Sequence, residues 1–125
     1  MPKQASRKTL ALISHDGKKA DMVAFVMDHK ERLRGFDLVA THTTGKLIKE
    51  KTGLAARCLL SGPFGGDAQI AALVAEGRVN AVFFFLDPLG KHPHDPDIQG
   101  LLRICNVHNV PLATNIATAA LLINA

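Results

Sequence analysis

The sequence contains no tryptophan and no tyrosine, and its aromatic side chains other than histidine are six phenylalanines. Proteins that bind single-stranded nucleic acid stack the bases on exposed aromatic rings, so this shortage argues against nucleic acid as a partner. The net charge of +4, from 15 basic and 11 acidic residues, favours anionic ligands. We therefore expect a small anion as the ligand and no nucleic acid partner.

Cysteine is also scarce, and long apolar runs are absent. Cys58 lies in an apolar, strand-like run and Cys105 on the apolar stripe of a predicted helix, without CxxC spacing. This pattern predicts two buried thiols in a reducing compartment. No apolar run approaches the ~20 residues of a membrane span, and TLALIS after the basic start is too short for a signal peptide. We expect a cytoplasmic protein with no membrane partner.

Short apolar runs alternate with helical patterns along the chain. Runs that are apolar throughout are buried on both faces, which is typical of parallel strands covered by helices on both sides. With 125 residues the chain can bury a substantial core, so we predict a single domain over residues 1–125. The expected fold class is α/β, a three-layer α/β/α sandwich with a five-stranded, mostly parallel, doubly wound sheet. The predicted strands are residues 9–14, 36–41, 56–61, 81–87 and 110–114, and helical stripes include Ile70, Leu73 and Val74 and, later, Ile98, Leu101, Leu102 and Cys105.

Most of the remaining polar residues follow these strands directly. In open α/β sheets the ligand binds outside the carboxyl ends of the strands, so we expect these residues to share one site. They are His15, Asp16 and Lys19 after the first strand, Thr41, Thr43 and Thr44 after the second, Ser61, Gly62 and Asp67 after the third, Asp87, His92, His94 and Asp97 after the fourth, and Thr114 and Asn115 after the fifth.

Two of the turns on this rim have features of a phosphate site. The segment THTTGK, residues 41–46, places three hydroxyl groups ahead of a predicted helix, whose first N–H groups and positive end attract an anion. Ser61 and Gly62 add a hydroxyl group and an unobstructed N–H, and Lys19 adds a positive charge. The segment is not a P-loop, because Ala40 and Leu47 stand where that motif requires Gly and Ser or Thr. A phosphomonoester site is predicted, with simple capping of a helix by its threonines as the alternative.

The stretch SGPFGGDAQI, residues 61–70, surrounds Asp67 with three glycines and a proline. An acid in the first turn of a helix is favoured by the helix dipole by ~0.3–1 kcal/mol, so a purely charge-complementing Asp67 is one interpretation. The other is that Gly65 and Gly66 admit a substrate close to the backbone, where Asp67 abstracts a proton. Since the reference pKa of Asp is ~3.9, such a site would have to stabilise the resulting enediolate strongly.

The segment HPHDPD, residues 92–97, admits three interpretations. His92, His94 and Asp97 could bind a metal ion, although His-x-His spacing is a weak signal. A solvated, proline-rich loop with Asp95 as a helix cap is the second interpretation. In the third, His94 is a neutral hydrogen-bond donor that polarises a substrate carbonyl, with an acid orienting its ring.

SGPFGGDAQI, DPLGKHPHDPDIQGLLR and ATNIATA together resemble the methylglyoxal synthase family, over nearly the whole length of the chain. LISHDGKK and ATHTTGKLI are similar to the first two loops of that family. The resemblance implies a homohexameric lyase without cofactor or metal, which converts dihydroxyacetone phosphate to methylglyoxal and inorganic phosphate in a bypass of glycolysis.

The resemblance also implies roles for individual residues. Asp67 corresponds to the catalytic base of the family. Lys19, Thr41, Thr43, Thr44, Ser61 and Gly62 fall where the family holds phosphate, His15 and His94 where it contacts the substrate, and Asp16, Asp87 and Asp97 at its other active-site acids. His42, a further candidate for substrate binding, replaces a glycine common in that loop of the family. Members commonly continue past the last helix with a tail carrying a basic residue, whereas this sequence ends at Ala125, so we carry over no gating or coupling role of such a tail.

The fold also resembles the regulatory domain of carbamoyl phosphate synthetase and the cyclohydrolase domain of purine biosynthesis. A binding module of that kind needs the phosphate-binding turns but neither Asp67 nor His94, whose joint presence favours the enzyme. A receiver-type phosphoacceptor domain does not fit, because Ser61 and Gly62 follow the third strand in place of an aspartate.

Overall fold

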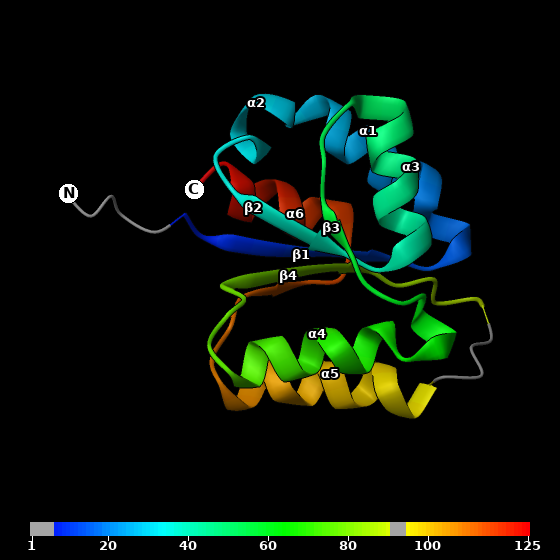
Figure 1. The fold of residues 1–125 in the computed structure, drawn as a ribbon, viewed down its shortest axis with the longest axis vertical. Coiled ribbons are helices and arrows are strands. Elements are labelled where there is room, and N and C mark those ends of the chain that lie inside the picture. The colour runs from blue at the N-terminus through cyan, green and yellow to red at the C-terminus, as the bar shows by residue number, and fades with distance from the viewer. Residues whose placement is uncertain (1–6, 91–94) are drawn as a thin grey trace.

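The computed structural model of the chain describes residues 7–90 and 95–125. Its centre is a five-stranded sheet in which every strand pair is parallel, in the order β3-β2-β1-β4-β5 (Figure 1). The strands are β1 (Thr9–Ser14), β2 (Asp37–Ala40), β3 (Arg57–Cys58), β4 (Ala81–Phe85) and β5 (Leu112–Ala113). All five predicted strands are present, although several are shorter than predicted.

Helices cover both faces of this sheet, which confirms the predicted α/β/α sandwich. In Figure 1, α1, α2, α3 and α6 lie on one side of the strands, and α4 and α5 lie on the other. The helices are η1 (Asp16–Lys18), α1 (Lys19–Asp28), α2 (Lys30–Leu33), α3 (His42–Thr52), η2 (Gly62–Phe64), α4 (Gly66–Ala75), α5 (Asp95–Val107) and α6 (Ile116–Ile123). No helix within residues 7–90 and 95–125 is both long and apolar enough to cross a membrane.

Each face of the sheet has its own buried core, because side chains alternate along a strand. In β1, Leu10 and Leu12 pack with the α1, α3 and α6 side, and Ala11 and Ile13 pack with the α4 and α5 side. The residues of β4 divide in the same way, which explains why both strands are apolar throughout. The carboxyl ends of β1 and β4 therefore lie between two packed cores.

One burial prediction is wrong. Cys58 is exposed, and so is its neighbour Arg57, because β3 is a two-residue strand at the edge of the sheet. Cys105 is fully buried on the inner face of α5, as predicted.

Candidate active site

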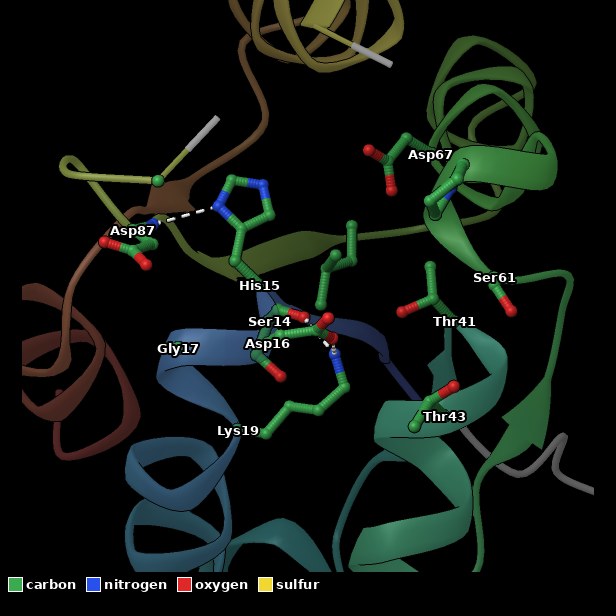
Figure 2. A pocket seen from close by; sticks show the side chains of 14 residues that line it. Ser14, His15, Asp16, Gly17, Lys19, Thr41, Thr43, Ser61, Asp67 and Asp87 are labelled. Atoms are coloured by element: carbon green, nitrogen blue, oxygen red, sulfur yellow. Dashed lines mark hydrogen bonds and ion pairs between the residues drawn. The ribbon is translucent and has the colours of Figure 1, made fainter. Parts of the chain in front are cut away.

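A cavity of about 320 Å³ opens at the carboxyl ends of β1, β2 and β3, and most of the predicted site residues line it (Figure 2). Those residues are His15, Asp16, Lys19, Thr41, Thr43, Ser61, Gly62, Asp67 and Asp87, and the structure adds Ile13, Ser14, Gly17, Pro63 and Gly90. The ends of β1 to β4 meet here as expected. The prediction is wrong for the fifth strand, because Thr114 and Asn115 line a second cavity and not this one.

His15 follows β1 directly, and its side chain is held in one orientation. The residue is 7% exposed, its ring packs edge to face on Phe84 at 5.1 Å, and its Nδ1 accepts a hydrogen bond from the backbone N–H of Asp87 at 2.9 Å. That hydrogen bond requires a lone pair on Nδ1, so a neutral ring carries its proton on Nε2. In Figure 2 the His15 ring extends into the cavity from the end of β1.

Asp87 follows β4 beside His15, and its carboxylate accepts a hydrogen bond within its own loop. Oδ1 accepts a hydrogen bond from the backbone N–H of Leu89 at 3.0 Å. A Cβ atom at position 17 would lie 2.4 Å from Asp87 Oδ2, so Gly17 leaves the space that this carboxylate fills. Asp87 therefore contributes to the site through the backbone N–H that orients His15, and its carboxylate shapes the adjoining loop.

Lys19, in the first turn of α1, is the single lysine or arginine among the described residues that line the cavity. Its ammonium group donates to the carbonyl oxygen of Ser14 at 3.0 Å and to Oδ1 of Asp16 at 2.8 Å. The side chain of Lys19 is 17% exposed, whereas that of Asp16 is fully exposed. Since an ammonium group has three donors, these contacts fix Lys19 in place and leave one donor for an anion.

The threonine turn begins α3, and its hydroxyl groups do not act as ordinary caps. Thr41 is the N-cap residue, yet its side chain makes no capping hydrogen bond and instead donates to Thr44 Oγ1 at 3.5 Å. Thr41 and Thr43 line the cavity, whereas Thr44 is buried beneath them. His42, on the same turn, is exposed and is not among the lining residues. Simple capping does not explain this arrangement.

The turn after β3 carries Ser61 and the glycines that precede Asp67. Ser61 makes no side-chain capping hydrogen bond, and its carbonyl oxygen accepts from the N–H groups of Phe64 at 3.0 Å and Gly66 at 2.9 Å. Gly65 has a φ of +107°, and a Cβ atom at Gly66 would lie 1.9 Å from the carbonyl oxygen of Leu60. These two glycines are therefore required by the turn and by the close packing of α4 on the end of β3. Our sequence interpretation, that they admit the substrate, missed this internal reason.

Asp67 is fully buried, at 0% exposure, in the first turn of α4. Complementing a helix dipole does not require burial, and burying a carboxylate costs more free energy than the dipole returns, so this burial disfavours that interpretation. In Figure 2 the carboxylate of Asp67 points into the cavity, toward the same space as the ring of His15. Because the carboxylate is buried, its charge interactions with a bound substrate are stronger than they would be at the surface.

Several predicted residues are not brought into the cavity by the described part of the chain. Asp97 is partly buried in the first turn of α5 and does not line the cavity. Thr44 is buried and does not line it either. His92 and His94 lie outside the described residues. Within 7–90 and 95–125, no group of three or more His, Cys, Asp or Glu side chains is arranged to hold a metal ion.

Comparison with known proteins agrees with this geometry. A family model described as the MGS-like domain matches residues 21–114. The sequence is 61% identical over 112 residues to a methylglyoxal synthase of Moorella thermoacetica, a match that covers 90% of this chain and 88% of that protein. The chain belongs to the methylglyoxal synthase family.

Other members of the methylglyoxal synthase family are similar along nearly the same length. The enzyme of Thermus thermophilus is 60% identical over 116 residues, which are 93% of this chain and 92% of that protein. The crystal structure of the methylglyoxal synthase of Elizabethkingia anophelis has a TM-score of 0.90 at 43% identity, covering 95% of this chain and 78% of that one. The family resemblance inferred from the loop motifs is confirmed.

Proposed function

We propose that this chain is a carbon–oxygen lyase that converts dihydroxyacetone phosphate to methylglyoxal and inorganic phosphate. The observation that carries the proposal is the fully buried carboxylate of Asp67, which faces a cavity whose other walls supply hydroxyl groups and an ammonium group. A phosphate ester with an acidic C–H bond matches this cavity, because the hydroxyl and ammonium groups can bind its phosphate and the carboxylate of Asp67 can accept its proton. The high identity to several methylglyoxal synthases supports the same reaction.

The phosphate group would bind between Lys19 and the two turns that carry Thr41, Thr43, Ser61 and Gly62. These residues offer one ammonium group, three hydroxyl groups and a backbone N–H, and all of them line the cavity. The positive end of α3 adds to the attraction, because the side chain of Thr41 does not cap it. We call Lys19, Thr41, Thr43, Ser61 and Gly62 the phosphate cradle.

Asp67 would act as the general base on C3 of the substrate. It takes one proton from C3, and the C–H electron pair forms the C2–C3 double bond of an enediolate. The negative charge that develops on the C2 oxygen needs a hydrogen-bond donor. His15 fits this need, because the Asp87 N–H on Nδ1 leaves the ring proton on Nε2. His94, outside the described residues, remains a second donor on the family resemblance alone.

Phosphate would then leave from C1. The C3 hydroxyl group gives its proton to the C2 oxygen, electrons from the C3 oxygen form the aldehyde carbonyl, the double bond moves to C1–C2, and the C1–O bond breaks with its electron pair on the departing phosphate. Asp67 passes the proton taken from C3 to that phosphate, which leaves as hydrogen phosphate. The enol product loses the proton of its C2 hydroxyl group and gains one at C1 to become methylglyoxal. Because the net change is loss of the elements of phosphoric acid, the reaction balances without an oxidant or a reductant.

A direct assay tests this function. Purified chain is incubated with dihydroxyacetone phosphate in the presence of EDTA, and methylglyoxal and inorganic phosphate are measured separately. We expect the two products in equal amounts and no effect of the chelator. Binding of phosphate without any methylglyoxal would instead indicate a regulatory module like that of carbamoyl phosphate synthetase.

We also propose that the chain assembles as a homohexamer. Large apolar side chains are exposed on the single chain, among them Phe64 at 78%, Leu89 at 93% and Leu121 at 76%. Contact with further copies would remove these side chains from water. Light scattering should give six times the chain mass of 13.4 kDa; a monomer at working concentration would contradict the proposal.

A further inference from the structure

Ser14, the last residue of β1, has a buried hydroxyl group that the mechanism above does not use. The residue is 5% exposed, and its Oγ lies 3.0 Å from Oγ1 of Thr44 in the first turn of α3. Alternation along β1 places Ser14 on the same face of the sheet as Leu10 and Leu12, which is the face that α3 covers. The contact therefore joins the end of a central strand to the start of a helix.

The same residue is connected to both sides of the phosphate cradle. Through its hydroxyl group Ser14 contacts Thr44, which in turn accepts a hydrogen bond from Thr41 at 3.5 Å. Through its carbonyl oxygen Ser14 accepts the hydrogen bond from Lys19 at 3.0 Å. One residue thus links the threonine turn, which supplies hydroxyl groups, to the lysine, which supplies the charge.

We propose that Ser14 is a positioning residue for phosphate binding, which acts through Thr44 to hold the first turn of α3 at a fixed distance from Lys19. The proposal rests on the proposed function, in that the phosphate held is that of the substrate. With Ser14 in place, the buried hydroxyl of Thr44 has a partner in the strand. Without it, the hydroxyl group of Thr44 draws more strongly on that of Thr41, so that Thr44 competes with the bound phosphate for the Thr41 donor.

A positioning role for Ser14 and a purely structural one predict different effects on phosphate affinity. A hydroxyl group that only stabilises the fold lowers the unfolding free energy when it is removed, without changing ligand affinity. Thr52, at the other end of α3, offers this comparison. Its Oγ1 donates to the carbonyl oxygen of Ile48 at 2.7 Å, and the residue is 4% exposed.

The experiment is a double-mutant cycle read by calorimetric titration with inorganic phosphate. The variants are Ser14→Ala, Thr44→Val and the two combined, with Thr52→Val as the matched control. We expect Ser14→Ala to weaken phosphate binding about two- to twelvefold, the range for one neutral hydrogen bond. In the Thr44→Val background the same change should have less than about a twofold effect, because the partner is already gone. Thr52→Val should lower the melting temperature and leave phosphate affinity unchanged.

Two results would overturn the proposal. One is phosphate affinity in Ser14→Ala equal to that of the unaltered chain. The other is an effect of Ser14→Ala that multiplies fully with that of Thr44→Val. If Ser14→Ala does not fold, Ser14→Cys, which keeps the size of the side chain but bonds more weakly, takes its place in the cycle.

Turnover separates this proposal from the proposed function. Methylglyoxal formation by the unaltered chain tests the function, whatever Ser14 does. In an active enzyme, Ser14→Ala should raise KM by a factor similar to the loss in phosphate affinity, with a smaller change in kcat. A fall in kcat at constant KM would place Ser14 in the chemistry and contradict the positioning role.

Discussion

The backbone N–H of Asp87 donates a hydrogen bond to Nδ1 of His15 at 2.9 Å. This contact connects the loop after β4 to the end of β1, and it decides which ring nitrogen of a neutral His15 carries the proton. The sequence predicts Asp87 as an active-site acid, but at this point the residue acts through its backbone N–H and not through its side chain. A neutral His15 therefore carries its proton on Nε2, the nitrogen that we propose as donor to the C2 oxygen of the substrate.

Two substitutions of His15 distinguish its ring nitrogens. The amide nitrogen of Gln can take the place of Nε2, whereas the amide of Asn reaches only the position of Nδ1. We expect His15→Asn to lower kcat by about 10²- to 10³-fold, the usual loss for one donor to a developing oxyanion, and His15→Gln to retain more activity. Steady-state kinetics on both folded variants provide the measurement. Equal activity in His15→Asn and the unaltered chain would exclude His15 as that donor.

Lys19 should contribute to binding more than to chemistry, because the phosphate carries its charge before and during the reaction. Lys19→Met removes a charge-assisted hydrogen bond, for which about 1.5–3 kcal/mol is typical, so we expect KM to rise by about 10- to 150-fold. Lys18→Met is the matched control, since Lys18 pairs with Asp21 at 3.7 Å and does not line the cavity. A similar rise in KM for both variants would indicate general electrostatic attraction in place of a specific contact.

Gly66 and Gly100 provide a matched pair for the packing beneath Asp67. In Gly66→Ala the new Cβ atom would meet the carbonyl oxygen of Leu60 at 1.9 Å, so α4 must shift. We expect lower stability and a loss of activity. Gly100 lies within α5. Among the described residues beyond its own helix backbone and chain neighbours, no atom lies within 4 Å of the position that a Cβ atom would take. Gly100→Ala should therefore raise the free energy of unfolding by about 0.5–1 kcal/mol. Urea unfolding of both variants measures this, and an unaffected Gly66→Ala would contradict the packing.

The buried thiol of Cys105 should make stability depend on alkaline pH. Burial raises the pKa of Cys105 from 9.0 to about 11. Between those values the unfolded chain loses the proton first, so the stabilisation is present below pH 9 and is lost as pH rises toward 11, by on the order of 2–3 kcal/mol. Urea unfolding from about pH 8 to 11 should show a smaller decline in Cys105→Ala. In thiol labelling of the native chain, exposed Cys58 should react first; rapid reaction of Cys105 would contradict its burial.

Much of the fold could be predicted because its central strands are buried on both sides. The uniformly apolar run of β4 is typical of a parallel strand covered on both faces, and its short length favours a strand over a helix. Strand order is not encoded in such local patterns, and this is why the sequence pattern wrongly predicts that Cys58 is buried. Its run looks like the others, but β3 lies at the edge.

The candidate site could be predicted in outline for a related reason. Parallel strands bring their carboxyl ends to one edge, so the polar residues after β1 to β4 meet whatever the exact strand lengths. The depth of each residue depends on packing that the sequence does not show. Asp67 could have been a surface acid, and Thr44 a cavity residue. For Thr44 a signal did exist, since its spacing of four from Ile48, and of eight from Thr52, places all three on the buried face of α3.

The measurement that tests the central claim most directly is the turnover of Asp67→Asn. This change keeps the size and polarity of the side chain but removes the base. General base catalysis typically contributes ~10²- to 10⁴-fold, so we expect kcat to fall by at least about that factor. Asp28→Asn, at an exposed acid near the end of α1, is the matched control and should retain full activity.

Binding must be measured on the same protein, so that loss of the base can be separated from loss of the site. Phosphoglycolate, an anionic mimic of the enediolate, should bind Asp67→Asn at least as tightly as the unaltered chain, because repulsion by the carboxylate is gone. The account predicts retained phosphoglycolate binding by calorimetry together with the collapse of methylglyoxal formation. Near-normal methylglyoxal formation by folded Asp67→Asn would contradict it and would move the base to another acid of the cavity, with Asp16 and Asp87 as the candidates.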